Sequence, residues 1–168
     1  MSAPARWNLL ALVLVLVTLG LSWLALPEGE IPVHFGADGR ADDVGTRTSL
    51  IGVIGGLFVA TWLFMAWLSH ASDRLHWSMV NIPRKDHWEQ PEHQPVARQR
   101  LAEDMALVNL WTMGLFAAIC PVMVVSVRRG EMTGFLGGTV LVLIVGFCVA
   151  LFALVRHRNR FYRDVPEA

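Results

Sequence analysis

Four long apolar segments separated by polar ones dominate the hydropathy pattern of the chain. They cover approximately residues 7–26, 50–68, 106–127 and 135–155. Helices of about 20 residues, rising about 1.5 Å per residue, match the roughly 30 Å hydrocarbon core of a bilayer. Backbone polar groups in lipid must be paired within the segment, which favours helices over strands. The pattern predicts an all-α membrane protein, a four-transmembrane-helix bundle forming a single integral membrane domain over residues 1–168.

The first apolar segment has a competing interpretation as a cleaved signal peptide, because Arg6 gives it a basic flank. The apolar region of a signal peptide covers only about 7–15 residues and ends at a small-x-small cleavage site. This segment is longer, and the nearest candidate cleavage site ends at Leu26-Pro27. We therefore expect a membrane anchor that is retained.

The loop between the first two segments, residues 27–49, concentrates polar and turn-forming residues. Ile31, Val33 and Phe35 recur with a period of two, which predicts a short strand with one apolar face and with His34 on the other. Residues 36–39 (GADG) are typical of a tight turn, because glycine adopts positive φ and an aspartate can bind the backbone two residues on. A compact cap of turn and strand is the prediction.

The second long loop, residues 69–105, is expected to end inside a helix. Pro95 suits the first turn of a helix that continues into the third apolar segment. The run 81–88 (NIPRKDHW) combines a proline, a basic pair and a tryptophan, which predicts a segment lying against lipid headgroups. Four histidines also lie in this loop: His70, His76, His87 and His93. Those within each pair are six residues apart and would face away from each other on one helix, so we expect separate solvated side chains.

Basic residues distribute unevenly between the two sides of the predicted membrane. Ten of the fourteen lie before the first segment, in the loop 69–105 or after the fourth segment. The other four are Arg40, Arg47, Arg128 and Arg129. Excess positive charge marks the cytoplasmic side. Both termini are therefore predicted to be cytoplasmic and the loop 27–49 to face outward.

Composition narrows the class further. Hydrophobic residues make up 54% of the chain and charged residues 17%, which is too apolar for a soluble domain of this length. The formal charge is zero, so nothing points to a nucleic-acid partner. Cys120 and Cys148 both lie in apolar segments and are expected to be buried thiols.

The four apolar segments contain few side chains that could take part in catalysis or ion transport. The four segments contain no Asp, Glu, Lys, Arg or His, which argues against a pump or ion carrier. HExxH, GxSxG and glycine-rich phosphate loops are missing from the sequence, and no cofactor is expected. Small residues recur four apart, as at Gly52 and Gly56 or Gly146 and Ala150. Such pairs permit close helix packing and oligomers through small-residue faces, although glycine is also simply common in membrane spans.

Three interpretations of the outward loop remain open. After the turn, Asp42 and Asp43 return toward His34, so a carboxylate can hydrogen-bond the imidazole in a purely structural cap. Imidazole with carboxylate oxygen also suits a divalent metal, with His34 and Asp42 as candidate ligands. The third interpretation is recognition of a partner. The candidate binding residues are Pro32, His34, Phe35, Gly39, Asp42 and Asp43.

The run LPEGEIPVHFGADGRAD, residues 26–42, resembles the signature of a bacterial membrane family, domain of unknown function 1648, the N-terminal module of SdpI-like immunity proteins. Matching positions are Leu26, Pro27, Ile31, Pro32, His34, Phe35, Gly39 and Asp42, whereas Gly36, Ala41 and Val44 replace the usual asparagine, proline and aromatic residue. The run 81–88 also resembles a family pattern, N-x-P-x-K-x-x-W, through Asn81, Pro83, Lys85 and Trp88.

The resemblance implies a multi-pass protein of a bacterial plasma membrane that protects against a secreted peptide toxin or signals to a cytoplasmic regulator. Our leading hypothesis is accordingly a non-catalytic membrane protein whose outward loop recognises a peptide or protein. An accessory or structural subunit of a larger membrane complex is the second hypothesis. A metal-dependent membrane enzyme using His34 and Asp42 is the third.

Overall fold

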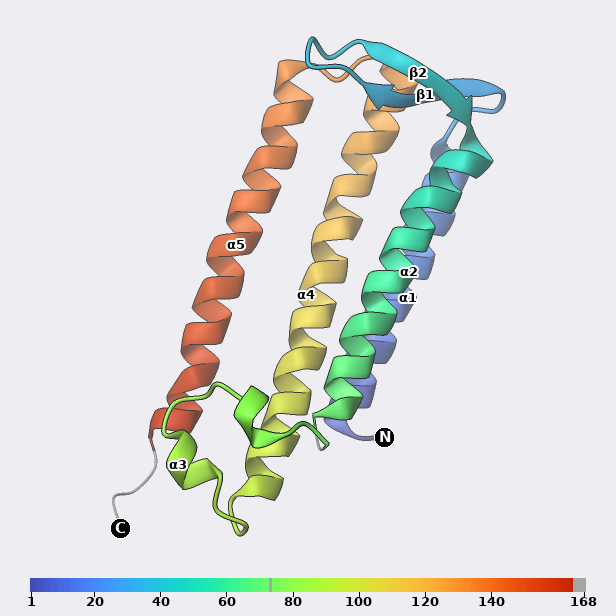
Figure 1. Ribbon diagram of the computed structural model, residues 1–168. Helices are drawn as coiled ribbons and strands as arrows, with labels where there is room; N and C mark the ends of the chain where they lie inside the picture. Colours follow the sequence, from blue (N-terminus) through green and yellow to red (C-terminus); the bar gives the residue numbers. More distant parts are fainter. Residues whose placement is uncertain (73, 165–168) are drawn as a thin grey trace.

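A computed structural model describes residues 1–72 and 74–164 of the chain (Figure 1). Its elements are α1 (Ala3–Ala25), β1 (Glu30–Phe35), β2 (Ala41–Thr46), α2 (Arg47–Ala71), the short 3₁₀ helix η1 (Trp77–Met79), α3 (Lys85–Trp88), α4 (Gln94–Arg129) and α5 (Gly134–Arg163). The four long helices run up and down along one common direction. The β-hairpin lies at one end of the bundle, which we call the hairpin end. The N-terminus and the end of α5 lie at the opposite end, which we call the termini end (Figure 1).

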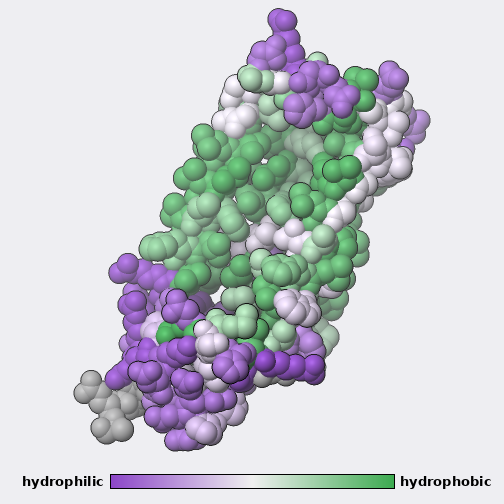
Figure 2. Space-filling model, in the orientation of Figure 1, coloured by the Kyte–Doolittle hydropathy of each residue, from purple (hydrophilic) through white to green (hydrophobic). Residues whose placement is uncertain are grey.

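Four helices of this chain are long and apolar enough to cross a membrane, as the hydropathy pattern predicted. Figure 2 shows the corresponding apolar middle between two hydrophilic ends. Each long helix extends beyond its apolar segment at one end or both. The largest extension is in α4, which begins at Gln94 with Pro95 in its first turn and runs unbroken to Arg129. The prediction that Pro95 starts a helix leading into the third span is confirmed.

Two expectations about the loops need correction. The cap contains two strands rather than one, so the chain is mainly helical with a small antiparallel sheet and not all-α. The loop 69–105 also contains the short helices η1 and α3, which were not expected, and its first residues, 69–71, still belong to α2. The second strand, ADDVGT, has little intrinsic strand preference, and it forms because it pairs with β1.

Local sequence explains where the long helices begin and end. Thr46 and Ser49 form a reciprocal capping box at the start of α2, each side chain binding the other residue's backbone N–H. Thr133 caps α5 by accepting from the N–H of Leu136. Gly130, at φ 72°, ends α4 in the left-handed conformation that glycine tolerates best. Only four residues then separate α4 from α5, so these helices form an antiparallel pair.

Helix α4 is the centre of the bundle and packs against α1, α2 and α5. Four of its buried residues recur at intervals of seven: Ala106, Met113, Cys120 and Val127. Such a seam is typical of helices that cross at a shallow angle. Beside it, Phe116 stacks on Phe58 of α2 with ring centroids 4.3 Å apart.

A polar contact joins three helices inside the apolar bundle. Asn109 of α4 is fully buried, and its Nδ2 donates to Asn8 Oδ1 of α1 at 2.8 Å. The Trp62 Nε1 of α2 donates to the Asn8 carbonyl oxygen at 2.9 Å. Amide hydrogen bonds across helices stabilise membrane bundles because lipid offers polar groups no alternative partner. Trp62 therefore acts as an interhelical donor.

The small-residue pairs do not pack helices together within this chain. A Cβ placed on Gly52, Gly56 or Gly146 would meet no atom within 4 Å. Gly114, Ala118, Gly146 and Ala150 instead line an open apolar groove of about 610 Å³ between α4 and α5. An oligomer through these faces stays a prediction.

The hairpin is fastened to the helices at two places. Ile31, 2% exposed, packs from β1 against Leu26, Val124 and Val127. At the hairpin tip, the carbonyl of Gly39 accepts a hydrogen bond from the Met132 amide at 2.7 Å, in the turn between α4 and α5. The hairpin thereby connects the first half of the chain to the second.

Replacing Gly39 with alanine should destabilise the protein. Gly39 has a φ of 78°, and a Cβ there would lie 2.3 Å from the Met132 carbonyl oxygen. Left-handed backbone strain alone costs about 1–2 kcal/mol, and the clash adds to it. Thermal unfolding in detergent should show a lower midpoint for Gly39→Ala. The matched variant Gly138→Ala, with a helical backbone and open space around the new methyl group, should retain or raise the midpoint; an equal loss in both variants would contradict this account.

Candidate functional site

An imidazole–carboxylate pair lies on the solvent-facing side of the hairpin. The register of the sheet shifts on both sides of His34. Such irregularities re-aim side chains, and here His34 Nδ1 lies 2.6 Å from Asp42 Oδ1. Both side chains remain accessible, at 68% and 52% exposure. The predicted approach of Asp42 to His34 is therefore confirmed.

The other aspartates of the hairpin bind backbone instead. Asp43 stands opposite His34 in the register, but its Oδ1 accepts from the N–H of Val44 at 2.8 Å. Asp38 Oδ1 accepts from the N–H of Arg40 at 3.1 Å, the turn contact that the sequence predicted. Of the two carboxylates expected near His34, the structure brings one, Asp42, into contact.

The remaining predicted hairpin residues are Pro32, Phe35 and Gly39, and they belong to the structure of the hairpin. Pro32 and Phe35 are half-buried in β1, and Gly39 holds the tip. Gly36 lies directly under the carboxylates, because a Cβ there would come within 3.2 Å of Asp38 Oδ1 and 3.3 Å of Asp42 Oδ2. A glycine at position 36 therefore leaves room for the Asp42 side chain to turn toward His34.

A metal site on the hairpin would need further ligands. Among residues 1–72 and 74–164, no three His, Cys, Asp or Glu side chains gather closely enough to hold an ion. His34 and Asp42 could supply two ligands, with solvent supplying the others.

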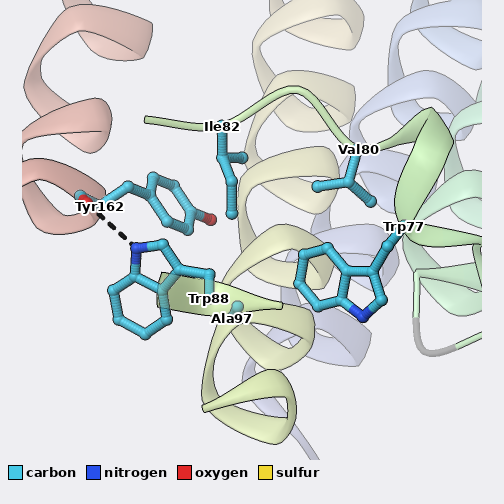
Figure 3. Packing of buried hydrophobic residues seen from close by; sticks show 6 residues of the cluster. All are labelled: Trp77, Val80, Ile82, Trp88, Ala97 and Tyr162. Atoms are coloured by element: carbon cyan, nitrogen blue, oxygen red, sulfur yellow. Dashed lines mark hydrogen bonds between the residues drawn. The ribbon is translucent and has the colours of Figure 1, made fainter. Parts of the chain in front are cut away.

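The termini end carries a second, more buried cluster. Trp77, Val80, Ile82, Trp88, Ala97 and Tyr162 form a small apolar core between the loop, α4 and α5 (Figure 3). Trp88 is 7% exposed, and its Nε1 donates to the Tyr162 carbonyl oxygen at 3.0 Å (Figure 3). This position corrects the expectation that the run 81–88 places its tryptophan against lipid headgroups.

The four family-like residues of this run do not converge on one site. Trp88 is buried, Pro83 and Lys85 are half-buried, and Asn81 is exposed. Asn81 borders a cavity of about 210 Å³ together with Asp104 and Tyr162. The run therefore covers the end of the α4–α5 pair.

A charged network beside this core was not anticipated from the sequence. Arg158 of α5 binds Asp104 of α4 through Nε, and its Nη2 lies 3.6 Å from Glu103 Oε2. The Tyr162 hydroxyl donates to the second oxygen of Asp104 at 2.9 Å. Arg100 lies 3.6 Å from Glu103 and stacks over the ring of Phe161. Two acids and two arginines thus clasp α5 to α4 just beyond their apolar segments.

Two histidines in the loop meet, contrary to the expectation of separate solvated side chains. His87 Nε2 lies 3.2 Å from His93 Nδ1, and both rings are half-buried. The expectation was wrong because the two residues are not on one helix: His87 belongs to α3 and His93 is the N-cap of α4. Partial loss of water around His87, together with the neighbouring His93, lowers the pKa of the His87 imidazole.

A wide crevice also lies at the termini end, between α1, α2 and the start of α4. Its volume is about 760 Å³, and its lining includes Asn8, His70, Gln94 and Arg98. Arg98 Nη1 donates to the carbonyls of Ser72 and Leu75 at 3.1 and 3.0 Å. It thereby satisfies one acceptor at the C-cap of α2 and one in the loop that follows.

No protein-family model, curated protein or solved structure matches this chain. The two ends of the bundle therefore have only their own geometry and charge to indicate a role.

Removing the Arg158 side-chain charge should loosen α5. Arg158→Met leaves Asp104 and Glu103 with Arg100 as their nearby cation. We expect a loss of about 1–3 kcal/mol in the free energy of unfolding, less than for a fully buried pair because the side chains keep some contact with solvent. Urea or thermal unfolding in detergent measures it.

Two further variants test whether the loss comes from the interaction of Arg158 with Asp104. Arg160→Met removes an exposed arginine from the same helix and should change stability little. Combining Arg158→Met with Asp104→Asn should cost less than the sum of the single losses, because the two groups interact. Equal effects of Arg158→Met and Arg160→Met would contradict the proposed clasp.

Proposed function

We propose that this protein is a non-catalytic, multi-pass membrane protein of a bacterial plasma membrane whose hairpin binds a peptide or protein outside the cell, as the resemblance to SdpI-like immunity proteins implies. The observation that carries the proposal is the accessible His34–Asp42 pair on a hairpin that packs against α4 and binds the turn between α4 and α5. A ligand bound there contacts a surface that is continuous with the whole bundle.

The chemistry of the exposed hairpin surface suits a polar or charged polypeptide. Arg40 and Asp38 stand beside the pair with side chains 87% and 66% exposed, so groups of both signs are offered within a short distance. Val44, 58% exposed, adds an apolar contact. Complementary charge and a small apolar centre are the usual components of a protein-binding surface.

Basic residues support the proposed orientation. Most of the arginines gather at the termini end, in the loop, at the start of α4 and in the last turns of α5, which favours a cytoplasmic position for that end. The hairpin would then face outward, where secreted peptides are encountered. Neighbouring genes for a secreted peptide and a small repressor would favour the immunity form of this function.

Replacing His34 and Asp42 with alanine should abolish protection. Cells that express the protein would be challenged with a panel of membrane-active peptides, and growth inhibition would be measured. Central interface residues cost about 2 kcal/mol or more when truncated, so we expect at least about a tenfold increase in sensitivity to the recognised peptide. Arg129→Ala, an exposed charge at the same end but outside the hairpin, is the control and should protect like the unaltered protein.

Immunoblotting of membranes must show equal amounts of all variants. Equal protection by the unaltered protein and the His34→Ala, Asp42→Ala double variant across the panel would exclude the immunity function.

Topology is the precondition of this proposal and can be measured separately. A cysteine at Ala37, in a background with Cys120→Ser and Cys148→Ser, should react with a membrane-impermeant maleimide in intact cells. Ala37 is exposed in the hairpin turn, so access depends only on the side of the membrane. A reaction that occurs only after the cells are broken open would place the hairpin in the cytoplasm and contradict recognition of external molecules.

A second function, as an accessory subunit of a larger membrane complex, is favoured by the open groove between α4 and α5. Small residues on both walls would let a helix of another protein approach closely. A partner that co-purifies in mild detergent would support this function, and a lone monodisperse species would count against it.

A further inference from the structure

Helix α5 lies at the edge of the bundle and packs against α4 along one side (Figure 1). Its other side carries a row of exposed side chains at steps of three or four residues, which keeps them on one helix face. Within the apolar segment the row consists of Val142, Val145, Val149 and Phe152, each 54–70% exposed. Beyond the segment it continues with Arg156, Arg160 and Arg163, which we call the arginine stripe. One face of α5 is therefore apolar along most of its length and cationic at its end.

Contacts on the opposite side of α5 keep the arginine stripe directed away from the bundle. The Arg158 Nε and the Tyr162 hydroxyl both bind the carboxylate of Asp104 on α4. The carbonyl of Tyr162 also accepts from the indole of Trp88. Since residues 158 and 162 point toward α4 and the loop, the residues of the arginine stripe point outward on the same turns.

The arginine stripe has no acidic partner in the part of the chain that the structure describes, residues 1–72 and 74–164. The arginines that form ion pairs there are Arg40, Arg47, Arg100 and Arg158. Like charges three or four residues apart on a helix repel one another, and a counterion between them removes the repulsion. The stripe therefore favours an anionic partner from outside the chain.

The position of the arginine stripe along α5 indicates what that partner is. The apolar segment ends at Val155, so the stripe starts where the hydrocarbon core of a bilayer would end. The stripe is about 10 Å long on a helix, and the headgroup layer of one leaflet is about 5–8 Å thick. The phosphate groups of phospholipids lie in that layer. An arginine guanidinium binds phosphate through two parallel hydrogen bonds, so the stripe suits this anion.

We propose that the arginine stripe binds the headgroups of anionic phospholipids, such as phosphatidylglycerol, in the leaflet at the termini end. Zwitterionic lipids offer the same phosphate, but their own ammonium group offsets its charge, so the stripe prefers lipids with a net negative charge. The acyl chains of the bound lipids lie along the apolar row from Phe152 to Val142. This inference rests on the membrane location proposed above and does not depend on what the hairpin binds.

Lipid competition in nanodiscs measures this preference. The full chain would be reconstituted with equal amounts of phosphatidylglycerol and phosphatidylcholine, and native mass spectrometry would compare the two lipids that the released protein retains. A basic residue next to an anionic surface is worth about fivefold in association. We therefore expect retention to favour phosphatidylglycerol by more than about tenfold. The triple variant Arg156→Gln, Arg160→Gln, Arg163→Gln should lose most of that preference.

The matched control is the triple variant with lysine at the same three positions. It keeps the charge and should keep most of the preference. Glutamine, lysine and arginine have similar helix propensities, and the three positions are exposed, so both triple variants should fold like the unaltered protein. A second control, Arg128→Gln with Arg129→Gln, removes exposed arginines at the hairpin end and should reduce the preference by less than the glutamine triple variant.

Several results would overturn the proposal. They are equal retention of the two lipids by the unaltered protein, an unchanged preference in the glutamine triple variant, and an equal loss in the lysine variant or in the hairpin-end control. A chain that does not enter nanodiscs would contradict the membrane location as well. Failure of peptide recognition by the hairpin would leave the lipid preference intact, so the two proposals fail separately.

Discussion

The packing of α4 against its neighbours is the interaction on which the other features of this protein depend. In lipid, apolar side chains gain nothing by leaving their surroundings, so helices associate through close packing and a few polar bonds. The buried residues spaced seven apart from Ala106 to Val127 supply that packing. Asn109 supplies a polar bond between α4 and α1. The hairpin packs through Ile31 against the C-terminal part of α4. The cluster around Trp88 packs against the first turns of the same helix. Without this central helix neither end has a support.

Sequence reasoning anticipated the features that depend on local pattern. Apolar length predicted four helices, Pro95 predicted the start of the longest one, and glycine with aspartate predicted the turn that brings Asp42 to His34. Contacts between distant residues were missed. Arg158 and Asp104 are 54 positions apart, and either one read alone resembles an ordinary charge beyond a membrane span. Their positions just outside two adjacent apolar segments were the signal that could have suggested a pair.

Other expectations failed because of an assumption about helix continuity. His87 and His93 diverge on an uninterrupted helix, but the turn around Gln90 folds them together. Trp88 was expected to lie against lipid headgroups because the run 81–88 combines it with a proline and a basic pair. It is buried instead because the loop folds back over the end of α5, where a carbonyl accepts from its indole. Tertiary contacts of the loop override the general preference of the residue in both cases.

The way in which α5 is held gives it a mechanical character that the other long helices lack. It is fastened near its extremities, at one by the short turn that binds Gly39 and at the other by Arg158, while the stretch between borders an open groove. A helix held at both ends and loosely packed between them can bend in its middle without breaking either attachment. Bilayers of different thickness impose different tilts on a span of fixed length. In a bilayer, a change in hydrocarbon thickness would therefore strain the two attachments of α5, one of which holds the hairpin, and lipid composition would act on the hairpin through this helix.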